Sequence, residues 1–160
     1  MRSLVLNLLK ICIRIMFPAV NSITTAEFAK WRSDSAKLQP LVLDARSPAE
    51  YGVSHLKSAI RIDPIILHSK KALRISKDSP IVVYCSIGYR SAKIAQQLQK
   101  QGFTSIYNLS GGIFEWANEG RPIFKDDNHQ TEFVHPYDAK WGKMLKANYH
   151  PQNCSYLASR

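Results

Sequence analysis

The segment IVVYCSIGYRSAKIAQQL, residues 81–98, constrains the fold more than any other part of the chain. It begins with four consecutive apolar residues after Pro80, without alternation, which is typical of a strand covered on both faces. A glycine-containing turn follows, and Ala92, Ala95 and Leu98 then recur at helical spacing. A buried strand that runs through a short turn into a helix indicates an α/β fold.

The same alternation of patterns continues on both sides of this segment. Extended segments are expected at 41–44, 59–62, 81–84 and 105–109. Helices are expected at 24–34, 47–51, about 65–75, 90–102 and 111–120, the first starting from a cap at Thr24 or Thr25. Strands that alternate with helices predict a mostly parallel sheet of about five strands, flanked by helices on both faces.

Length and composition indicate one globular domain with short extensions. The chain has 160 residues, of which 45% are hydrophobic and 21% charged. We assign residues 22–125 to the domain, 1–21 to an N-terminal extension and 126–160 to a C-terminal extension, because 35 residues bury too little for a second core. In the C-terminal extension, Tyr137, Trp141 and Leu145 lie at i, i+4 and i+8, which predicts one helical face packed on the domain.

The N-terminal extension has the pattern of an amphipathic cationic helix. Insertion across a bilayer is not favoured, because Lys10 and Arg14 would cost about 2.5–3.5 kcal/mol each, whereas each apolar residue returns only about 0.3–0.6 kcal/mol. Ser3, Asn7, Lys10 and Arg14 line one narrow stripe of such a helix. Several interpretations remain open: a helix packed on the domain, residues outside the true translation start, peripheral membrane contact through residues 1–16, or an export signal.

The formal net charge of +10 is unevenly distributed. Residues 1–16, 65–80 and 81–104 each carry a surplus of three positive charges, counted as Lys and Arg against Asp and Glu. Positive potential attracts small anions or acidic partners, although a solvated basic face is the more common meaning. No interleaving of aromatic and basic residues and no recognition-helix pattern accompany the charge, so nucleic acid is not an expected partner.

The cysteines and histidines indicate neither a disulfide framework nor a metal site. Cys12, Cys85 and Cys154 are widely spaced and form no CxxC pair, which favours a reducing, cytoplasmic compartment. The three histidines of the C-terminal extension, with Cys154, are too irregularly spaced for a zinc site. We expect no metal and no cofactor.

Cys85 follows the central strand directly, where a parallel sheet binds its ligands. Asp44 ends another predicted strand, so the two residues should lie at the same sheet edge. The backbone N–H groups from Ser86 to Arg90 can form an anion-binding nest, with Gly88 supplying the necessary conformation. Such surroundings lower a thiol pKa from about 8.5 to between about 3.5 and 7.5, so Cys85 is expected to be a nucleophilic thiolate. The alternative is an inert buried cysteine at the end of a strand.

Three motifs together resemble the rhodanese-like domain. CSIGYRS is preceded by VLDARSPAEY and followed by NLSGGIFEW, in the order and spacing of that family, over roughly residues 22–124. The resemblance implies a sulfurtransferase without a cofactor, in which Cys85 takes a sulfane sulfur from a small anionic donor such as thiosulfate and passes it to a thiol or cyanide. It further implies that the loop residues Ser86, Ile87, Gly88, Tyr89 and Arg90 bind the donor, and that Asp44, Arg46 and Ser91 support the loop.

Two other functions remain as alternatives. Related cysteine phosphatases and arsenate reductases resemble this design but have five residues between Cys and Arg, whereas Cys85 and Arg90 are separated by four, which favours sulfur over phosphorus. The second alternative is a noncatalytic rhodanese-like module that binds proteins; the retained Cys85 counts against it.

The sequence also departs from the family pattern. Glu50 stands where thiosulfate-specialised relatives tend to carry a cation, and Ile87 and Tyr89 are uncharged, so thiosulfate is expected to be a poor donor. SHLKSAI, residues 54–60, lacks the usual glycines and proline of this turn, and its His55 is interpreted as a structural residue. Cys154 is a candidate resolving thiol for a Cys85 persulfide.

Overall fold

The computed structural model describes residues 2–63 and 75–151, and its centre is a five-stranded parallel sheet. The strands are β1 (Asn21–Ile23), β2 (Leu41–Asp44), β3 (Ile60–Arg61), β4 (Ile81–Tyr84) and β5 (Ile106–Leu109), in the order β1-β5-β4-β2-β3. The predicted α/β class and strand number are confirmed. The sequence analysis did not predict β1, which begins one residue before the proposed domain boundary. The helix expected at about 65–75 lies almost wholly outside the described residues. Cys154 also lies outside them.

The helices begin at the signals that the sequence carries. They are α1 (Arg2–Met16), α2 (Thr25–Ser33), α3 (Pro48–Val53), α5 (Tyr89–Lys100) and α6 (Gly112–Asn118). Thr24 and Ser47 each form a capping box with the glutamate three residues later, Glu27 and Glu50. These local hydrogen bonds satisfy backbone N–H groups that a helix start would otherwise leave unpaired.

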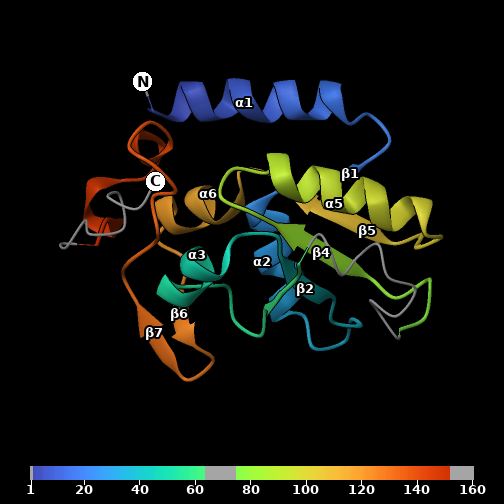
Figure 1. Cartoon of the computed structure of the whole chain (residues 1–160). Helices are drawn as coiled ribbons and strands as arrows, with labels where there is room; N and C mark the ends of the chain where they lie inside the picture. Colours follow the sequence, from blue (N-terminus) through green and yellow to red (C-terminus); the bar gives the residue numbers. More distant parts are fainter. Residues whose placement is uncertain (1, 64–74, 152–160) are drawn as a thin grey trace.

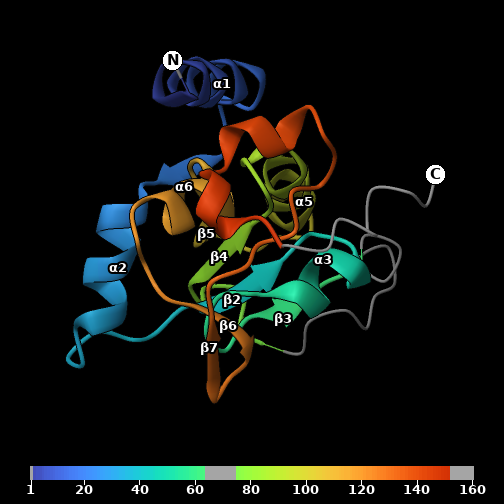
Figure 2. The ribbon, with the colours of Figure 1, turned by 90° about the vertical axis from the view of Figure 1, so that its left-hand side faces the viewer.

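The central strand β4 separates two apolar layers. Val82 and Tyr84 pack on one face with α2, α6 and residues 123–151, which we call the C-terminal segment. Ile81 and Val83 pack on the other face with α5. Both views show helices on each side of the sheet (Figures 1 and 2). Because all four residues of β4 are buried, the unbroken apolar run of the sequence reflects burial on both faces.

Helix α1 lies across the outside of α5, as both views show (Figures 1 and 2). It packs through Leu6 and Ile13, and Lys10 forms an ion pair with Glu115 of α6, with 2.6 Å between Nζ and Oε1. One side of α1 therefore packs on the domain, which was one of the interpretations of residues 1–16; the contacts leave membrane binding by its other side open. Within the described ranges, no helix has both the length and the apolar character required to cross a membrane.

The C-terminal segment is not the helix that its spacing predicted. It contains a hairpin of β6 (Ile123–Asp126) and β7 (His129–Thr131), followed by the short 3-10 helices η1 (Trp141–Met144) and η2 (Ala147–Tyr149). Tyr137 has a φ of 67°, in the left-handed region, which an α-helix cannot continue through. The expected contacts are nevertheless present, because Tyr137, Trp141 and Leu145 all pack against the apolar layer that contains α2 and α6.

Candidate active site

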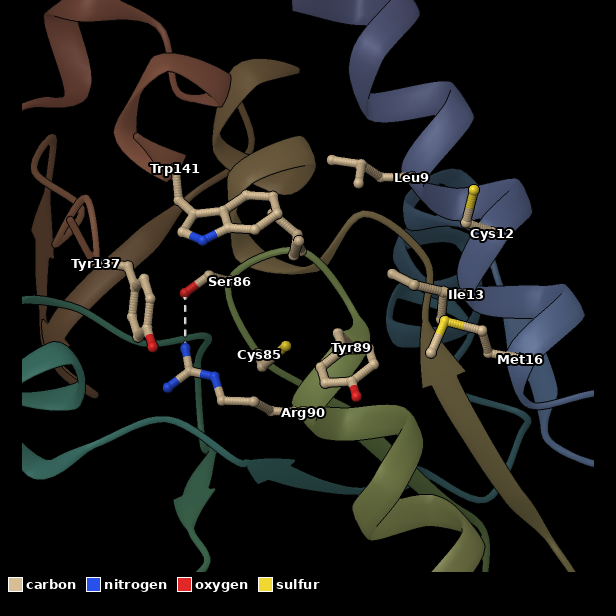
Figure 3. A pocket seen from close by; sticks show the side chains of 11 residues that line it. Leu9, Cys12, Ile13, Met16, Cys85, Ser86, Tyr89, Arg90, Tyr137 and Trp141 are labelled. Carbon is tan, nitrogen blue, oxygen red and sulfur yellow. Dashed lines mark hydrogen bonds between the residues drawn. The ribbon is translucent and has the colours of Figure 1, made fainter. Parts of the chain in front are cut away.

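The segment from Cys85 to Arg90, which we call the cysteine loop, comprises the turn after β4 and the first residues of α5, and it curls around the cysteine sulfur. The backbone N–H of Gly88 donates a hydrogen bond to Cys85 Sγ over 3.1 Å. Gly88 caps α5 with a φ of 108°, a conformation that residues with a Cβ rarely adopt. Figure 3 shows the sulfur inside the curve of the loop. The thiol therefore lies at the start of a helix and accepts a backbone hydrogen bond, as the sequence indicated.

Backbone N–H groups in the first turn of α6 donate hydrogen bonds to carbonyl oxygens of this loop. Ile113 N donates to Cys85 O over 2.9 Å, and Phe114 N donates to Ser86 O over 3.1 Å. A Cβ at Gly112 would lie 2.3 Å from Cys85 O, so only glycine permits this approach. Asn108 of β5 adds a hydrogen bond from Nδ2 to Gly88 O over 3.0 Å. The GG motif thus supports the cysteine loop.

Arg90 turns toward a carboxylate rather than standing as a free charge. It donates from Nη1 and Nη2 to the two carboxylate oxygens of Glu50 over 2.8 and 2.7 Å. Arg90 Nη2 also donates to Ser86 Oγ over 3.0 Å, a hydrogen bond that Figure 3 shows. Burial tends to raise the pKa of Glu50, but the hydrogen bonds and charge of Arg90 dominate and lower it from 4.5 to about 2. Glu50 is therefore ionised, and the pair carries no net charge.

Asp44 and Arg46 form a second ion pair, which is fully buried. Arg46 Nη2 donates to Asp44 Oδ2 over 2.7 Å and to Ser54 O over 2.6 Å, and Tyr84 Oη donates to the same carboxylate over 2.5 Å. Burial, together with the Asp44 charge, raises the pKa of Tyr84 well above its usual value, so the phenol stays a donor. This network fixes the carboxyl ends of β2 and β4 against the loop between β2 and β3.

An apolar cavity of about 310 Å³, which we call the Cys85 pocket, lies above the loop. Its lining combines α1, the loop and the C-terminal segment: Leu9, Cys12, Ile13, Met16, Cys85, Ser86, Ile87, Tyr89, Arg90, Tyr137 and Trp141 (Figure 3). Only 1% of the Cys85 surface is exposed. Asp44 and Cys85 lie at the same sheet edge, as expected, but only Cys85 lines the pocket, because Asp44 is buried in its pair with Arg46.

The sequence of the domain matches a known family. The model for the rhodanese-like domain matches residues 24–119. The chain belongs to the rhodanese-like domain family. In the solved structure of a rhodanese-related protein from Thermoplasma volcanium, the same fold recurs with a TM-score of 0.55 and 28% sequence identity, over 66% of this chain and 98% of that one.

Among curated proteins, this rhodanese-like chain is 34% identical over 104 residues to a sulfurtransferase from Allochromatium vinosum. The aligned region covers 65% of this chain and 94% of that protein. It is 32% identical over 103 residues to the probable adenylyltransferase/sulfurtransferase MoeZ from Mycobacterium tuberculosis. That match covers 64% of this chain but only 26% of MoeZ, so the chain corresponds to about a quarter of this relative.

The structure places the predicted loop residues of this rhodanese-like domain around one sulfur. Cys85, Ser86, Ile87, Tyr89 and Arg90 line the pocket, and Gly88 contacts the sulfur. The supporting residues lie elsewhere: Asp44 and Arg46 pair with each other, and Ser91 is buried at the start of α5. His55 stacks on Tyr51 with 4.2 Å between ring centroids, away from the pocket.

Several site residues were not found from the sequence. Glu50 was noted only as a departure, although its capping box with Ser47 was a signal that its position is fixed. Asn108 and Tyr84 carried no such signal. The contributions of α1 and Trp141 to the pocket depend on packing between segments far apart in the chain.

The turn after His55 forms without the usual glycine. Ser58 takes a φ of 59°, in the left-handed region, and its backbone N donates to Asp127 Oδ1 over 2.7 Å. A serine thus takes the left-handed conformation in this turn, and a hydrogen bond to Asp127 holds its backbone.

Proposed function

We propose that this protein is a sulfurtransferase in which Cys85 carries a sulfane sulfur as a persulfide. In the first step, the Cys85 thiolate attacks the outer sulfur of a donor. A new S–S bond forms, and the bond between that sulfur and the rest of the donor breaks, the leaving group departing with the electron pair. In the second step, an acceptor thiolate or cyanide attacks the terminal sulfur of the persulfide and regenerates the Cys85 thiolate.

The hydrogen bond from Gly88 N to Cys85 Sγ carries this proposal. A backbone donor aimed at the sulfur, at the start of α5, stabilises negative charge on the thiolate and on the persulfide that replaces it. The relatives from Allochromatium vinosum and Mycobacterium tuberculosis are named as a sulfurtransferase and a probable adenylyltransferase/sulfurtransferase, which supports the same chemistry.

The arrangement of Arg90 disfavours a phosphatase or arsenate reductase. A phosphoryl group develops charge that a free cation must stabilise, but Nη1 and Nη2 of Arg90 already donate hydrogen bonds to Glu50 and Ser86. The loop is also one residue shorter than the phosphatase loop that it resembles. These observations support sulfur transfer.

Turnover measurements test the proposal. The wild type should form thiocyanate or an acceptor persulfide from a sulfane donor, and Cys85→Ser should abolish this activity, while hydrolysis of an aryl phosphate stays below it. Faster hydrolysis of the phosphate would favour the phosphatase. Absence of both activities, with several donors, would favour the noncatalytic docking module.

A further inference from the structure

The walls of the Cys85 pocket come largely from outside the region that the family model matches. Leu9, Ile13 and Met16 belong to α1, and Tyr137 and Trp141 to the C-terminal segment, whereas the match covers residues 24–119. These side chains are apolar or aromatic, and they lie over the reactive sulfur (Figure 3). The shape of the pocket is thus a property of this chain in addition to its family fold.

The pocket offers little to a small, strongly hydrated dianion. Arg90 is the one charged residue among the described residues that line it, and its charge is balanced by Glu50. Moving a compact dianion such as thiosulfate from water into apolar surroundings is costly unless fixed charges compensate it. Ile87 and Tyr89, on the loop itself, add no charge.

We propose that the preferred donor carries its sulfane sulfur on an apolar organic group. This inference rests on the proposed sulfurtransferase function and names its substrate class. The sulfane sulfur meets Cys85 Sγ, while the organic group packs against Ile13, Met16 and Trp141. A cavity of about 310 Å³ has the size of a small-molecule site and can hold a group as large as a benzene ring.

Two thiosulfonates provide suitable probes, because they share the reacting group. With benzenethiosulfonate, the Cys85 thiolate takes the terminal sulfur and benzenesulfinate leaves; with methanethiosulfonate, methanesulfinate leaves. We expect kcat/KM to be about tenfold or more higher for the benzene compound, after correction for the reactivity of each donor with a free small thiol, because the ring is buried. Thiosulfate should react more slowly than the benzene compound.

Variants of the wall test whether this preference comes from the pocket. Met16→Gln and Trp141→Ala should each lower the ratio of the two kcat/KM values about fivefold. Ile60→Gln is the matched control, since Ile60 and Met16 are both 56% exposed but Ile60 lies on the edge strand β3. Circular dichroism checks that each variant is folded.

The outcomes separate this inference from the proposed function. If every donor fails to load Cys85, the sulfurtransferase proposal fails. If donors load Cys85 but the benzene compound has no advantage, or the wall variants leave the ratio unchanged, the sulfurtransferase stands and the apolar-donor inference is wrong.

A second inference comes from the opposite side of α1. Leu4, Leu8, Ile11 and Ile15 follow one another at helical spacing and are 63%, 54%, 54% and 73% exposed, whereas Leu6 and Ile13 face the domain. We call these four residues the outer stripe of α1. An apolar row of this kind on a folded domain indicates an interaction surface.

Two exposed basic residues lie on the same helix as the outer stripe. Arg2 and Arg14 are exposed, whereas Lys10 faces the domain and is paired with Glu115. Helix α1 contains no acidic residue, and Arg2 Nε donates to the backbone of Lys143 in η1 over 3.0 Å. Exposed lysines in and beside η1 extend this charge: Lys140, Lys143 and Lys146. Two copies of a chain with a net charge of +10 would repel each other, whereas an anionic bilayer complements both the charge and the apolar row.

We infer that the outer stripe of α1 lies in the interface of an anionic membrane. The full chain should float with vesicles of phosphatidylcholine and phosphatidylglycerol and bind pure phosphatidylcholine vesicles much less. The double variant Ile11→Gln/Ile15→Gln should lower the bound fraction about fivefold or more.

The control for membrane binding is Leu38→Gln/Ile60→Gln, which changes apolar residues that are 73% and 56% exposed elsewhere on the surface. This control should bind like the wild type. Equal loss of binding in both double variants would overturn the inference. So would a dimer seen by light scattering that is disrupted by Ile11→Gln/Ile15→Gln, with no binding to either kind of vesicle.

Discussion

Gly112 determines how closely α6 approaches the cysteine loop. Its φ of 56° and the 2.3 Å that would separate its Cβ from Cys85 O leave no room for a side chain. We therefore expect Gly112→Ala to destabilise the fold by about 2–4 kcal/mol and to reduce sulfur transfer, through left-handed strain and a clash with backbone.

Chemical denaturation checks this prediction against Gly52→Ala in α3. No atom lies within 4 Å of a Cβ at Gly52, so this replacement should leave stability unchanged or raise it by up to about 1 kcal/mol. If the two variants had the same unfolding free energy, the close contact between Gly112 of α6 and the backbone of Cys85 would be contradicted.

The carboxylate of Glu50 makes stability depend on pH. Its pKa of about 2 in the folded protein lies below the ordinary 4.5, so the ionised form stabilises the fold fully above about pH 4.5, and this contribution is lost as pH falls toward 2. This shift in the pKa of Glu50 corresponds to about 3 kcal/mol of unfolding free energy.

Denaturation of Glu50→Gln beside the wild type, between pH 6 and pH 2.5, tests this linkage. The difference in unfolding free energy should be largest near pH 6 and shrink as the solution becomes more acidic. Glu132→Gln, at an exposed residue, serves as the control. If the difference in unfolding free energy between the wild type and Glu50→Gln stayed constant with pH, the ionised state of Glu50 would be contradicted.

At the level of elements, the C-terminal segment completes both the core and the pocket. Leu145 follows η1 and is 1% exposed, and Asn118 of α6 binds the backbone on either side of it, at Met144 O and Lys146 N. We expect Leu145→Ala to cost about 2–4 kcal/mol, because it leaves a cavity between η1 and α6.

Thermal unfolding measures the effect of Leu145→Ala, with Asn148→Ala as the control at an exposed position of η2. If the segment were only loosely attached, both variants would unfold at the temperature of the wild type.

At the scale of the whole molecule, three parts of the chain build one site. The β4–loop–α5 unit and the position of Cys85 at the carboxyl edge of the sheet were predictable, because an apolar run, Gly88 and helical spacing are local signals. The Glu50–Arg90 pair was not, since the two residues are 40 positions apart and either could equally have faced solvent. Helix α1 is apolar on most sides, so its pattern did not reveal which side covers the pocket.

The mass of the Cys85 peptide after reaction with a sulfane donor tests the central claim most directly. The wild type should gain the mass of one sulfur atom on the peptide that contains Cys85, not on those that contain Cys12 or Cys154, and should lose it when an acceptor thiol is added. A Cys85 peptide of unchanged mass, in a folded protein and with every donor, would contradict the account.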